Sequence, residues 1–534
     1  MKTLLSFLSA IFLTTIPIHA QLRLPALISD HAMLQADKPV AIWGWATPGA
    51  QVKVAFVGGD ASSSSSFTAT ADANGKWSGQ LSAMKDGAAG QLNVTTDKGE
   101  TETVSNILVG EVWLGGGQSN MEYDIQGTGR VNTKNPDEVA EVAQNVVIAQ
   151  KEADAAKPPI RYFHVAAARA NEPKDDVKGQ WVLGDSKNVA RFSAVAWNFG
   201  VALQNKLHIP VGLIVSCVGN TPVETWMSRE TLLSTSVVAG VLERSKMELA
   251  AATPEKLAKY KADMDAWRAA NPTPQLQAQN QKDRPVAPPN MSAENYIPNQ
   301  YYNGMIRGLE PYTLRGFIWY QGLGNMFHPL EYSEMFQAMI KEWHSDWKDD
   351  QLPFYFGEEI NVYAKQTKPV EPNAVNIIRE QQHGALQLPG VGMVCTMDLG
   401  NGNGHFPKKK PVGERMANLA FKEVYKLPGL TLVNSPQYKS YEIQGNKIRL
   451  KFADAGGLRV RGGGELKGFA IRGATGDWVW ATGKIDGQDI IVWSDQIASP
   501  AAVRYAWATN PIQSVENGAG LPLYAFRTDT DSKE

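Results

Sequence analysis

The sequence has very few cysteines. Only Cys217 and Cys395 occur among 534 residues, and both stand inside apolar runs. Two cysteines cannot crosslink a chain of this length or form a zinc site of the usual spacing, which excludes a disulfide scaffold and a zinc fold. We expect both to be buried free thiols on neighbouring strands.

An excess of charge of one sign is also missing. Lys and Arg number 52 and Asp and Glu 54, which gives a formal net charge of −2. This balance gives no electrostatic reason to expect nucleic acid or an anionic membrane as a partner. No cluster of His, Cys and carboxylate residues has metal-ligand spacing, so we expect neither a metal nor another cofactor. The oligomeric state is not predicted.

Long hydrophobic runs are absent after the amino terminus. None of the later runs approaches about 18 consecutive apolar residues, so we expect no membrane span. Residues 1–20 start with Lys2, continue with an apolar run from Leu4 to Ile16 and end at Ala20. This pattern is typical of a secretory signal peptide. We therefore predict cleavage near Ala20 and export to the periplasm or the extracellular space.

The rest of the chain is long enough for several domains. Residues 21–105 contain short strand-like runs between Gly, Ser and Asn turns, which predicts a small antiparallel β-domain. Residues 106–428 alternate apolar strands with helix-like segments, which predicts an α/β domain with a mainly parallel sheet. Residues 429–534 return to β-type runs and are predicted to be a C-terminal β-rich region.

Four helices are predicted, at 193–206, 254–270, 331–347 and after Pro411. The third has an apolar stripe that we attribute to packing, formed by Tyr332, Phe336, Met339, Trp343 and Trp347. The three lysines 408–410 are expected to be a solvated lead-in to the last helix. Residues 271–290, inside an insertion at 254–300 of unassigned role, are rich in proline and glutamine and predict an exposed connection.

Polar residues gather where four of the predicted strands end. They are Ser119 in GGGQSN, Gly219 and Asn220 in CVGNTP, Gln321 and Asn325 in YQGLGN, and Asp398 and His405 in MDLGNGNGHFP. In an open parallel sheet, the loops at the carboxyl ends of the strands meet at one edge. We therefore expect these segments to form one site.

The set fits acyl transfer by a nucleophilic serine. Ser119 is the candidate nucleophile, and His405 is the candidate base because imidazole titrates near neutral pH. His328 is an alternative base. The candidate oxyanion donors are the N–H groups of Ser119 and Gly219 and the amide of Asn325, with Gln321 beside them. The GQSNM spacing differs from the G-x-S-x-G elbow, which argues against a standard α/β-hydrolase.

These segments resemble the four blocks of the SGNH (GDSL-type) esterase superfamily, and more narrowly the sequence is similar to the sialate O-acetylesterase family. The blocks are GQSNM at 117–121, Gly219 in VGNTPVETW, Asn325 in WYQGLGN and His405 in GHFPKKKPVGERMA. The similarity continues through most of the remaining chain, for example in YYNGMIRGLEPY at 301–312. The resemblance implies a flavodoxin-like three-layer SGNH core, flanked by β-rich regions of sandwich or jelly-roll type.

The resemblance also implies a secreted carbohydrate O-acetylesterase. Ser119 would be the nucleophile, His405 the general base and then the general acid, and Ser119, Gly219 and Asn325 the oxyanion hole. The substrate that the family suggests is 9-O-acetyl sialic acid. Acetylated xylan or pectin is the alternative, and a catalytically decayed carbohydrate-binding protein is a hypothesis of a different class.

The sequence departs from the superfamily pattern at the third catalytic residue. Relatives commonly carry a carboxylate two or three residues before the histidine, where this chain has Asn403 and Gly402. Some relatives carry a glutamate in the third block, where this chain has Leu323. Both usual acids are therefore missing.

Three explanations of the missing acid stay open. In the first, a Ser–His dyad has its imidazole oriented by a main-chain carbonyl or by Asn403. In the second, Asp398, Glu358 or Glu359 is recruited from a neighbouring strand end. In the third, the chain has lost activity. A carbonyl acceptor fixes the imidazole tautomer as well as an aspartate does, so the missing acid does not by itself imply inactivity.

Overall fold

The computed structural model describes residues 22–59, 64–251, 253–272, 297–371 and 373–530, together with the isolated positions 276, 283 and 285. The predicted signal peptide, residues 1–20, lies outside these ranges, as does most of the predicted connection at 271–290. Within the described ranges, every helix is too short or too polar to cross a bilayer.

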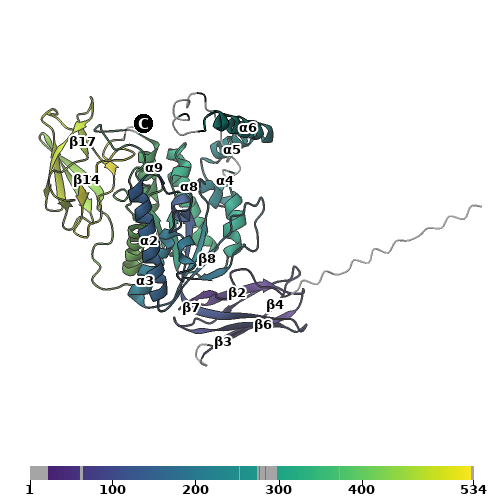
Figure 1. Cartoon of the computed structure of the whole chain (residues 1–534). Helices are drawn as coiled ribbons and strands as arrows, with labels where there is room; N and C mark the ends of the chain where they lie inside the picture. Colours follow the sequence, from purple (N-terminus) through teal and green to yellow (C-terminus); the bar gives the residue numbers. More distant parts are fainter. Residues whose placement is uncertain are drawn as a thin grey trace, which may run out of the picture.

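The centre of the fold is a sheet with the strand order β13-β12-β11-β7-β10-β8-β9. Figure 1 shows this part of the molecule, with β7 and β8 labelled, between the amino-terminal strands and the C-terminal strands. In chain order these strands are β7 (Thr101–Gly117), β8 (Ile160–His164), β9 (Trp181–Leu183), β10 (Val211–Cys217), β11 (Gly316–Tyr320), β12 (Phe354–Gly357) and β13 (Val391–Val394). Neighbouring strands are parallel except for β8 and β9, which are antiparallel. The predicted mainly parallel α/β sheet is confirmed.

Helices cover both faces of this sheet. On one face, Ile318 and Tyr320 of β11 pack into a cluster with α2 (Pro136–Ala155), α3 (Ala194–Leu207) and α10 (Lys410–Glu423). On the other, Phe317 and Trp319 pack with α8 (Tyr332–Asp346), on which Tyr332, Phe336, Met339 and Trp343 of the predicted apolar stripe are buried. Trp347, the last residue of the stripe, follows the helix and is half-buried. The remaining described α-helices are α1 (Ser119–Glu122), α4 (Arg229–Leu233), α5 (Val238–Ala251), α6 (Pro254–Ala270) and α9 (Ala374–His383).

The five strands predicted from the sequence have the flavodoxin-like order. In chain order they are β7, β10, β11, β12 and β13, and in the sheet they lie as β10-β7-β11-β12-β13, with the first strand between the second and the third. Strands β8 and β9, which were not predicted, extend the sheet beyond β10. All residues of β10 are buried, whereas β8 ends at the exposed His164 and carries the charged Arg161. The more apolar strand of the two takes the more interior position.

Strand β7 belongs to two sheets. Its first half pairs antiparallel with β6 (Ala89–Thr96), and its second half pairs in parallel with β10 and β11. The amino-terminal strands around it are β1 (Met33–Gln35), β2 (Val40–Trp45), β3 (Gln51–Gly58), β4 (Ser65–Thr70) and β5 (Lys76–Leu81). The domain boundary predicted between residues 105 and 106 therefore falls inside one strand.

The C-terminal region consists of β-strands around a core of its own. One sheet has the order β14 (Gln437–Gln444), β15 (Lys447–Ala453), β20 (Asp489–Trp493), β19 (Thr482–Asp486). A second has the order β18 (Val479–Trp480), β17 (Phe469–Arg472), β21 (Ala502–Tyr505), β23 (Phe526–Arg527). A short pair joins β16 (Arg459–Val460) and β22 (Val515–Glu516). Ile448 and Leu450 of the first sheet share the core with Phe469 and Tyr505 of the second.

Both cysteines are buried and free, as predicted. Cys217 ends β10, whereas Cys395 follows β13. The expectation of neighbouring strands is wrong, because β7, β11 and β12 lie between β10 and β13. Both strands are apolar, but an apolar strand does not reveal its place in the sheet.

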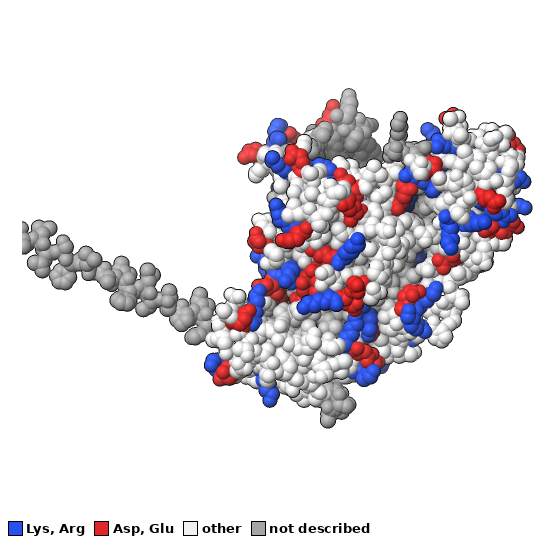
Figure 2. Space-filling model, turned by 180° about the vertical axis from the view of Figure 1, so that it is seen from behind, with Lys and Arg blue, Asp and Glu red and all other residues white. Residues whose placement is uncertain are grey.

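The charged surface mixes both signs. Figure 2 shows one face of the molecule, on which Lys and Arg are interspersed with Asp and Glu. Some of the charged side chains form ion pairs, such as Lys76–Asp175 at 2.7 Å and Arg449–Asp489 at 2.8 Å. The distribution agrees with the near balance of charges in the sequence.

Candidate active site

The glycine run at the end of β7 brings two strands close together and leads into Ser119. Gly117 has φ +130°, and a Cβ added to it would lie 2.3 Å from the carbonyl oxygen of Tyr320 in β11. Only glycine fits such a close approach. Ser119 then begins α1 and is half-buried at the carboxyl edge of the sheet. This is the edge where parallel sheets bind ligands.

Gly219 follows β10 and lies beside Ser119. A Cβ built on Gly219 would lie 3.4 Å from the Cβ of Ser119. The Gly219 N–H donates to the carboxylate of Glu122 at 2.8 Å, and Arg130 donates to the same oxygen. The predicted oxyanion donor is thus beside the predicted nucleophile. The Glu122 carboxylate has to move away before this N–H can bind an oxyanion.

Asn325 is buried close to the same strand ends. Its Oδ1 accepts hydrogen bonds from the N–H of Val223 at 2.9 Å and from the Gln321 amide at 3.0 Å. Its Nδ2 donates to Glu224 at 2.8 Å. An amide nitrogen carries two hydrogens, so one is left for an oxyanion. Gln321 is only 1% exposed, which makes it a support for Asn325 and not a group open to substrate.

A hydrogen bond joins the Ser119 segment to the His405 segment. Asn120, the residue after Ser119, donates from Nδ2 to the carbonyl oxygen of Gly404 at 3.1 Å. Ser119 precedes Asn120 and His405 follows Gly404, so each predicted catalytic residue is adjacent in sequence to one partner of this hydrogen bond. In the described part of the chain, the Ser119 hydroxyl and the His405 ring form no hydrogen bond with each other, so their pairing stays a prediction.

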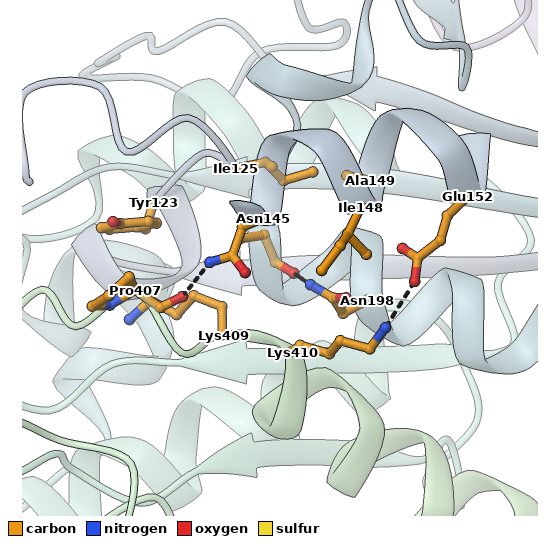
Figure 3. A pocket seen from close by; sticks show the side chains of 11 residues that line it. Tyr123, Ile125, Asn145, Ile148, Ala149, Glu152, Asn198, Pro407, Lys409 and Lys410 are labelled. Atoms are coloured by element: carbon orange, nitrogen blue, oxygen red, sulfur yellow. Dashed lines mark hydrogen bonds and ion pairs between the residues drawn. The ribbon is translucent and has the colours of Figure 1, made fainter. Parts of the chain in front are cut away.

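The prediction that all three lysines 408–410 are solvated is wrong for Lys409. Its exposed fraction is 1%, and its Nζ donates to Asn120 Oδ1 at 2.6 Å and lies 3.5 Å from the centre of the Phe406 ring. Burial lowers the pKa of Lys409 well below its usual range. Lys408 and Lys410 are exposed as expected. Figure 3 shows Lys409 and Lys410 beside α2 around a small cavity.

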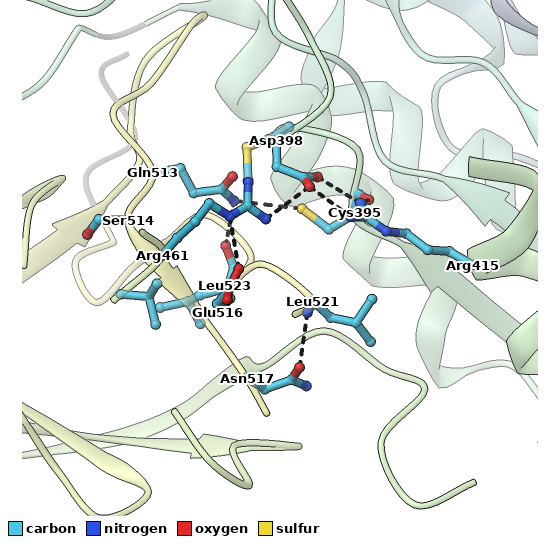
Figure 4. A network of polar contacts seen from close by, with 12 residues as sticks. Cys395, Asp398, Arg415, Arg461, Gln513, Ser514, Glu516, Asn517, Leu521 and Leu523 are labelled. Atoms are coloured by element: carbon cyan, nitrogen blue, oxygen red, sulfur yellow. Dashed lines mark hydrogen bonds and ion pairs between the residues drawn. The ribbon is translucent and has the colours of Figure 1, made fainter. Parts of the chain in front are cut away.

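Asp398 is engaged by two arginines. Arg415 bonds both of its oxygens at 2.7 Å, and Arg461 of the C-terminal region bonds one at 2.9 Å (Figure 4). These guanidinium groups outweigh burial and hold the pKa of Asp398 below its usual range. Within the described residues, Asp398 makes no hydrogen bond to His405. Its contacts join the central sheet to the C-terminal region.

The other two carboxylates considered for recruitment are buried behind the strand ends. Glu359 accepts the N–H of Leu323 at 3.0 Å, and burial raises its pKa to about 7. Glu358 is fully buried, 3.8 Å from the Nε2 of His383. Neither forms a hydrogen bond with His405 in the described ranges. The alternative base, His328, is exposed and lines a small cavity that also contains Asn325.

Known proteins are similar to this chain in sequence and in structure. A family model described as a sialic acid-specific acetylesterase, a carbohydrate esterase, matches residues 286–422, which include Asn325 and His405. The sialate O-acetylesterase of Mus musculus is 28% identical over 342 residues, which cover 60% of this chain and 56% of the mouse protein. The human sialate O-acetylesterase is 27% identical over 336 residues, 60% of this chain and 52% of that protein.

A solved structure extends the similarity to nearly the whole chain. The crystal structure of a carbohydrate acetylesterase from Xanthomonas citri is 30% identical, with a TM-score of 0.75. The match covers 96% of this chain and 100% of that one. The chain belongs to the sialate O-acetylesterase family of carbohydrate esterases. It spans about half the length of the curated relatives that it matches.

Three charged residues around the site of this family member were missed in the sequence. Glu122 directly follows the GQSNM block, Arg130 lies in a loop, and Glu138 lies on α2. Only the position of Glu122, one residue beyond a recognised block, offered a signal. Among the described residues, His, Cys, Asp and Glu side chains form no group of three or more that could hold a metal ion.

The surroundings of His405 predict activity at unusually low pH. Burial, followed by the positive charges of Arg130 and Lys409, lowers the pKa of His405 to about 4. A general base has to be unprotonated, so His405 in its predicted role would support activity above this pKa, and the activity would be lost as the pH falls through it. We expect kcat/KM for 4-nitrophenyl acetate to fall only near about pH 4.

A charge variant tests the cause of this shift. In Arg130→Gln one of the positive charges is gone, so the acid limb of the kcat/KM profile should move to higher pH. An acid limb close to the ordinary histidine pKa in the unaltered enzyme would contradict the assignment of His405 as a half-buried base. The control is the stability of the protein across the same pH range, measured by circular dichroism.

Proposed function

We propose that this protein is a carbohydrate O-acetylesterase that hydrolyses acetyl esters on sugar hydroxyls, with a core of the SGNH type. The observation that carries the proposal is the hydrogen bond from Asn120 to the Gly404 carbonyl. It joins the segment of the predicted nucleophile to the segment of the predicted base, at an edge where Gly219 also lies beside Ser119. Membership of the sialate O-acetylesterase family supports the same chemistry.

The proposed reaction has two steps. His405 takes the proton of the Ser119 hydroxyl, and the serine oxygen attacks the acetyl carbonyl carbon. The oxyanion is received by the N–H groups of Ser119 and Gly219 and by the remaining hydrogen of the Asn325 amide. His405 returns its proton to the sugar oxygen as that bond breaks. In the second step His405 takes a proton from water, whose oxygen attacks the acetyl-serine carbonyl. The bond to the serine oxygen breaks, His405 returns the proton to Ser119, and acetate is released.

Arg130 supports an acidic sugar as the substrate, with 9-O-acetyl sialic acid as the proposed one. Its Nη2 would lie 3.2 Å from a Cβ built on Gly219, and its side chain is 21% exposed. It is therefore a cation beside the predicted nucleophile. Its partner in this structure is the Glu122 carboxylate, and a substrate carboxylate would take that place once Glu122 moves off the Gly219 N–H. Guanidinium groups bind carboxylates strongly through paired hydrogen bonds. The curated relatives are named as sialate esterases.

Removing this cation should weaken binding of acidic substrates selectively. In Arg130→Gln we expect KM for 9-O-acetylated sialic acid to rise about tenfold to a hundredfold. This is the change in affinity expected when one charge-assisted hydrogen bond between the guanidinium group and the substrate carboxylate is lost. KM for 4-nitrophenyl acetate, which has no carboxylate, should stay within about twofold at pH 7.5, where His405 is neutral. Equal changes for both substrates would contradict a role in recognising the acid.

Acetylated plant polysaccharide is the second candidate, because the relative from Xanthomonas citri is named only as a carbohydrate acetylesterase. The decisive measurement is acetate release from 9-O-acetylated sialosides, acetylated pectin and acetylated xylan. Arg130 favours the first two, which carry carboxylates, over neutral xylan. Glycan binding without Ser119-dependent acetate release from any of them would instead support a decayed, carbohydrate-binding protein.

Export is the second part of the proposal. It depends on the signal-like pattern of residues 1–20. The test is the mass of the full-length protein recovered after expression in a bacterial host. A mature chain beginning near Gln21 in the periplasm or medium supports export, and an uncleaved chain retained inside the cell contradicts it.

A further inference from the structure

Glu138 is a buried carboxylate bonded to the loop that carries His405. It lies in the first turn of α2 and is 3% exposed. Its Oε1 accepts the Asn403 amide at 3.0 Å and the N–H of Asn132 at 3.1 Å. Its Oε2 accepts the Asn401 amide at 3.5 Å. Among the described residues, no Lys or Arg forms an ion pair with it, and the hydrogen-bond donors to this buried carboxyl group are all neutral.

The bonds continue from Glu138 to His405. Asn403 Oδ1 accepts the backbone N–H of His405 at 3.1 Å, and Asn401 Oδ1 accepts the N–H of Asn403 at 3.0 Å. Both amides therefore have their oxygens turned into the loop and their nitrogens turned toward Glu138. A carboxylate only accepts hydrogen bonds, so it fixes this orientation of both amides.

The helix that carries Glu138 is itself bonded to the segment after His405. Asn145 of α2 donates to the carbonyl oxygen of Pro407 at 3.3 Å, and Glu152 pairs with Lys410 at 2.7 Å (Figure 3). Glu138 thus belongs to a helix with bonds on both sides of His405 in the sequence. Together these bonds define the place of the loop relative to the sheet.

We propose that Glu138 is the positioning residue for His405, in place of the carboxylate that related enzymes carry on the histidine loop. Asn403 occupies one of the two positions where relatives have that acid, and it is the residue through which Glu138 acts. The carboxylate comes from α2, about 270 positions away in sequence, and its effect passes through an amide to the backbone of His405. This inference rests on the proposed roles of Ser119 and His405.

The proposal is tested by exchanging the carboxylate of Glu138 and the amide of Asn403, first singly and then together. In Glu138→Gln one carboxylate oxygen is replaced by an amide donor, so either the Asn401 or the Asn403 amide loses its acceptor. This disturbs the loop, and we expect kcat to fall about tenfold to a hundredfold with KM unchanged. Asn403→Asp alone places two carboxylates side by side and should lower kcat similarly. The double variant restores one donor and one acceptor, with the acid on the histidine loop. Its kcat should recover to within about threefold of the unaltered enzyme.

The matched control is Glu141→Gln, which removes a carboxylate one turn further along α2 and should leave kcat unchanged. Melting temperatures of all variants separate a positioning effect from loss of folding. A kcat within about twofold of normal in folded Glu138→Gln overturns the proposal, and so does a double variant whose defects simply add.

A second measurement separates this proposal from the proposed function. Titration of the His405 ring by NMR, assigned with His405→Ala, follows the loop without any substrate. A changed His405 signal in Glu138→Gln, with no change in Glu141→Gln, supports positioning even if Ser119→Ala shows that Ser119 is not the nucleophile. An unchanged His405 signal overturns the positioning role whatever the activity shows.

Discussion

Replacing Ser119 by alanine should lower kcat for acetate release by about ten-thousandfold to a millionfold, because the covalent step loses its nucleophile. KM and the melting temperature should change little, since Ser119 is half-buried and its hydroxyl supports no structural hydrogen bond among the described residues. His405→Ala should have a comparable effect. The double variant should be no worse than either single variant, because the two residues act as one unit.

The measurement is single-turnover and steady-state release from 4-nitrophenyl acetate and from acetylated sugars. Ser82→Ala, at an exposed serine of the amino-terminal region, is the matched control and should be normal. Labelling by a serine-directed phosphonate should be lost in Ser119→Ala alone. Retention of most activity in Ser119→Ala would assign the hydrolysis to another group and remove the basis of the proposed mechanism.

Replacing Asp398 by alanine should lower the free energy of unfolding by about 3 kcal/mol. Asp398 is buried, with a side chain 6% exposed, and its removal leaves Arg415, 12% exposed, without its main partner. Arg461 still has its ion pair with Glu516, so its charge stays compensated. The reason for the large effect is that removal of one partner leaves a buried charge uncompensated. Thermal or urea unfolding measures the change.

A second variant at this position, Asp398→Asn, tests whether Asp398 is the recruited acid that orients His405. If its role is the arginine network, folded Asp398→Asn should keep kcat within about threefold, far from the loss in His405→Ala. A loss as severe as that of His405→Ala would show that Asp398 orients the base. Asp495→Ala, at an exposed aspartate of the C-terminal region, is the control and should affect neither stability nor kcat.

Much of the fold followed from local patterns. The stripe from Tyr332 to Trp343 predicted α8, and the apolar runs ending at Gly117 and Cys217 predicted parallel strands. The order of β7, β10, β11, β12 and β13 agrees with the flavodoxin-like order that the resemblance implied, whereas the addition of β8 and β9 beyond β10 could not be predicted, because a short strand does not reveal its neighbours in a sheet. The predicted end of the amino-terminal domain falls inside β7, because this strand stays extended from one sheet into the next.

The site was predicted best where chemistry is tied to a motif. Ser119, Gly219, Asn325 and His405 all lie after strands of one sheet, as the sequence indicated. The contacts that residues of the site make with distant segments of the chain could not be predicted from the sequence. Nothing in the run of lysines 408–410 shows that the middle one points into the protein, because a turn of the chain decides which of them is covered. Glu138 lies on α2, a helix that was not among the predicted ones.

The continuity of β7 has a consequence for how the enzyme can be dissected. Truncation of the chain between residues 105 and 106 would divide β7. The first half of this strand pairs with β6 and the second half pairs with β11 in the parallel sheet, so both sheets would lose part of their hydrogen bonding. We therefore expect the two regions to melt in a single transition and to be inherited as one evolutionary unit. A fragment starting at residue 106 should be insoluble, whereas one starting at residue 22 should refold.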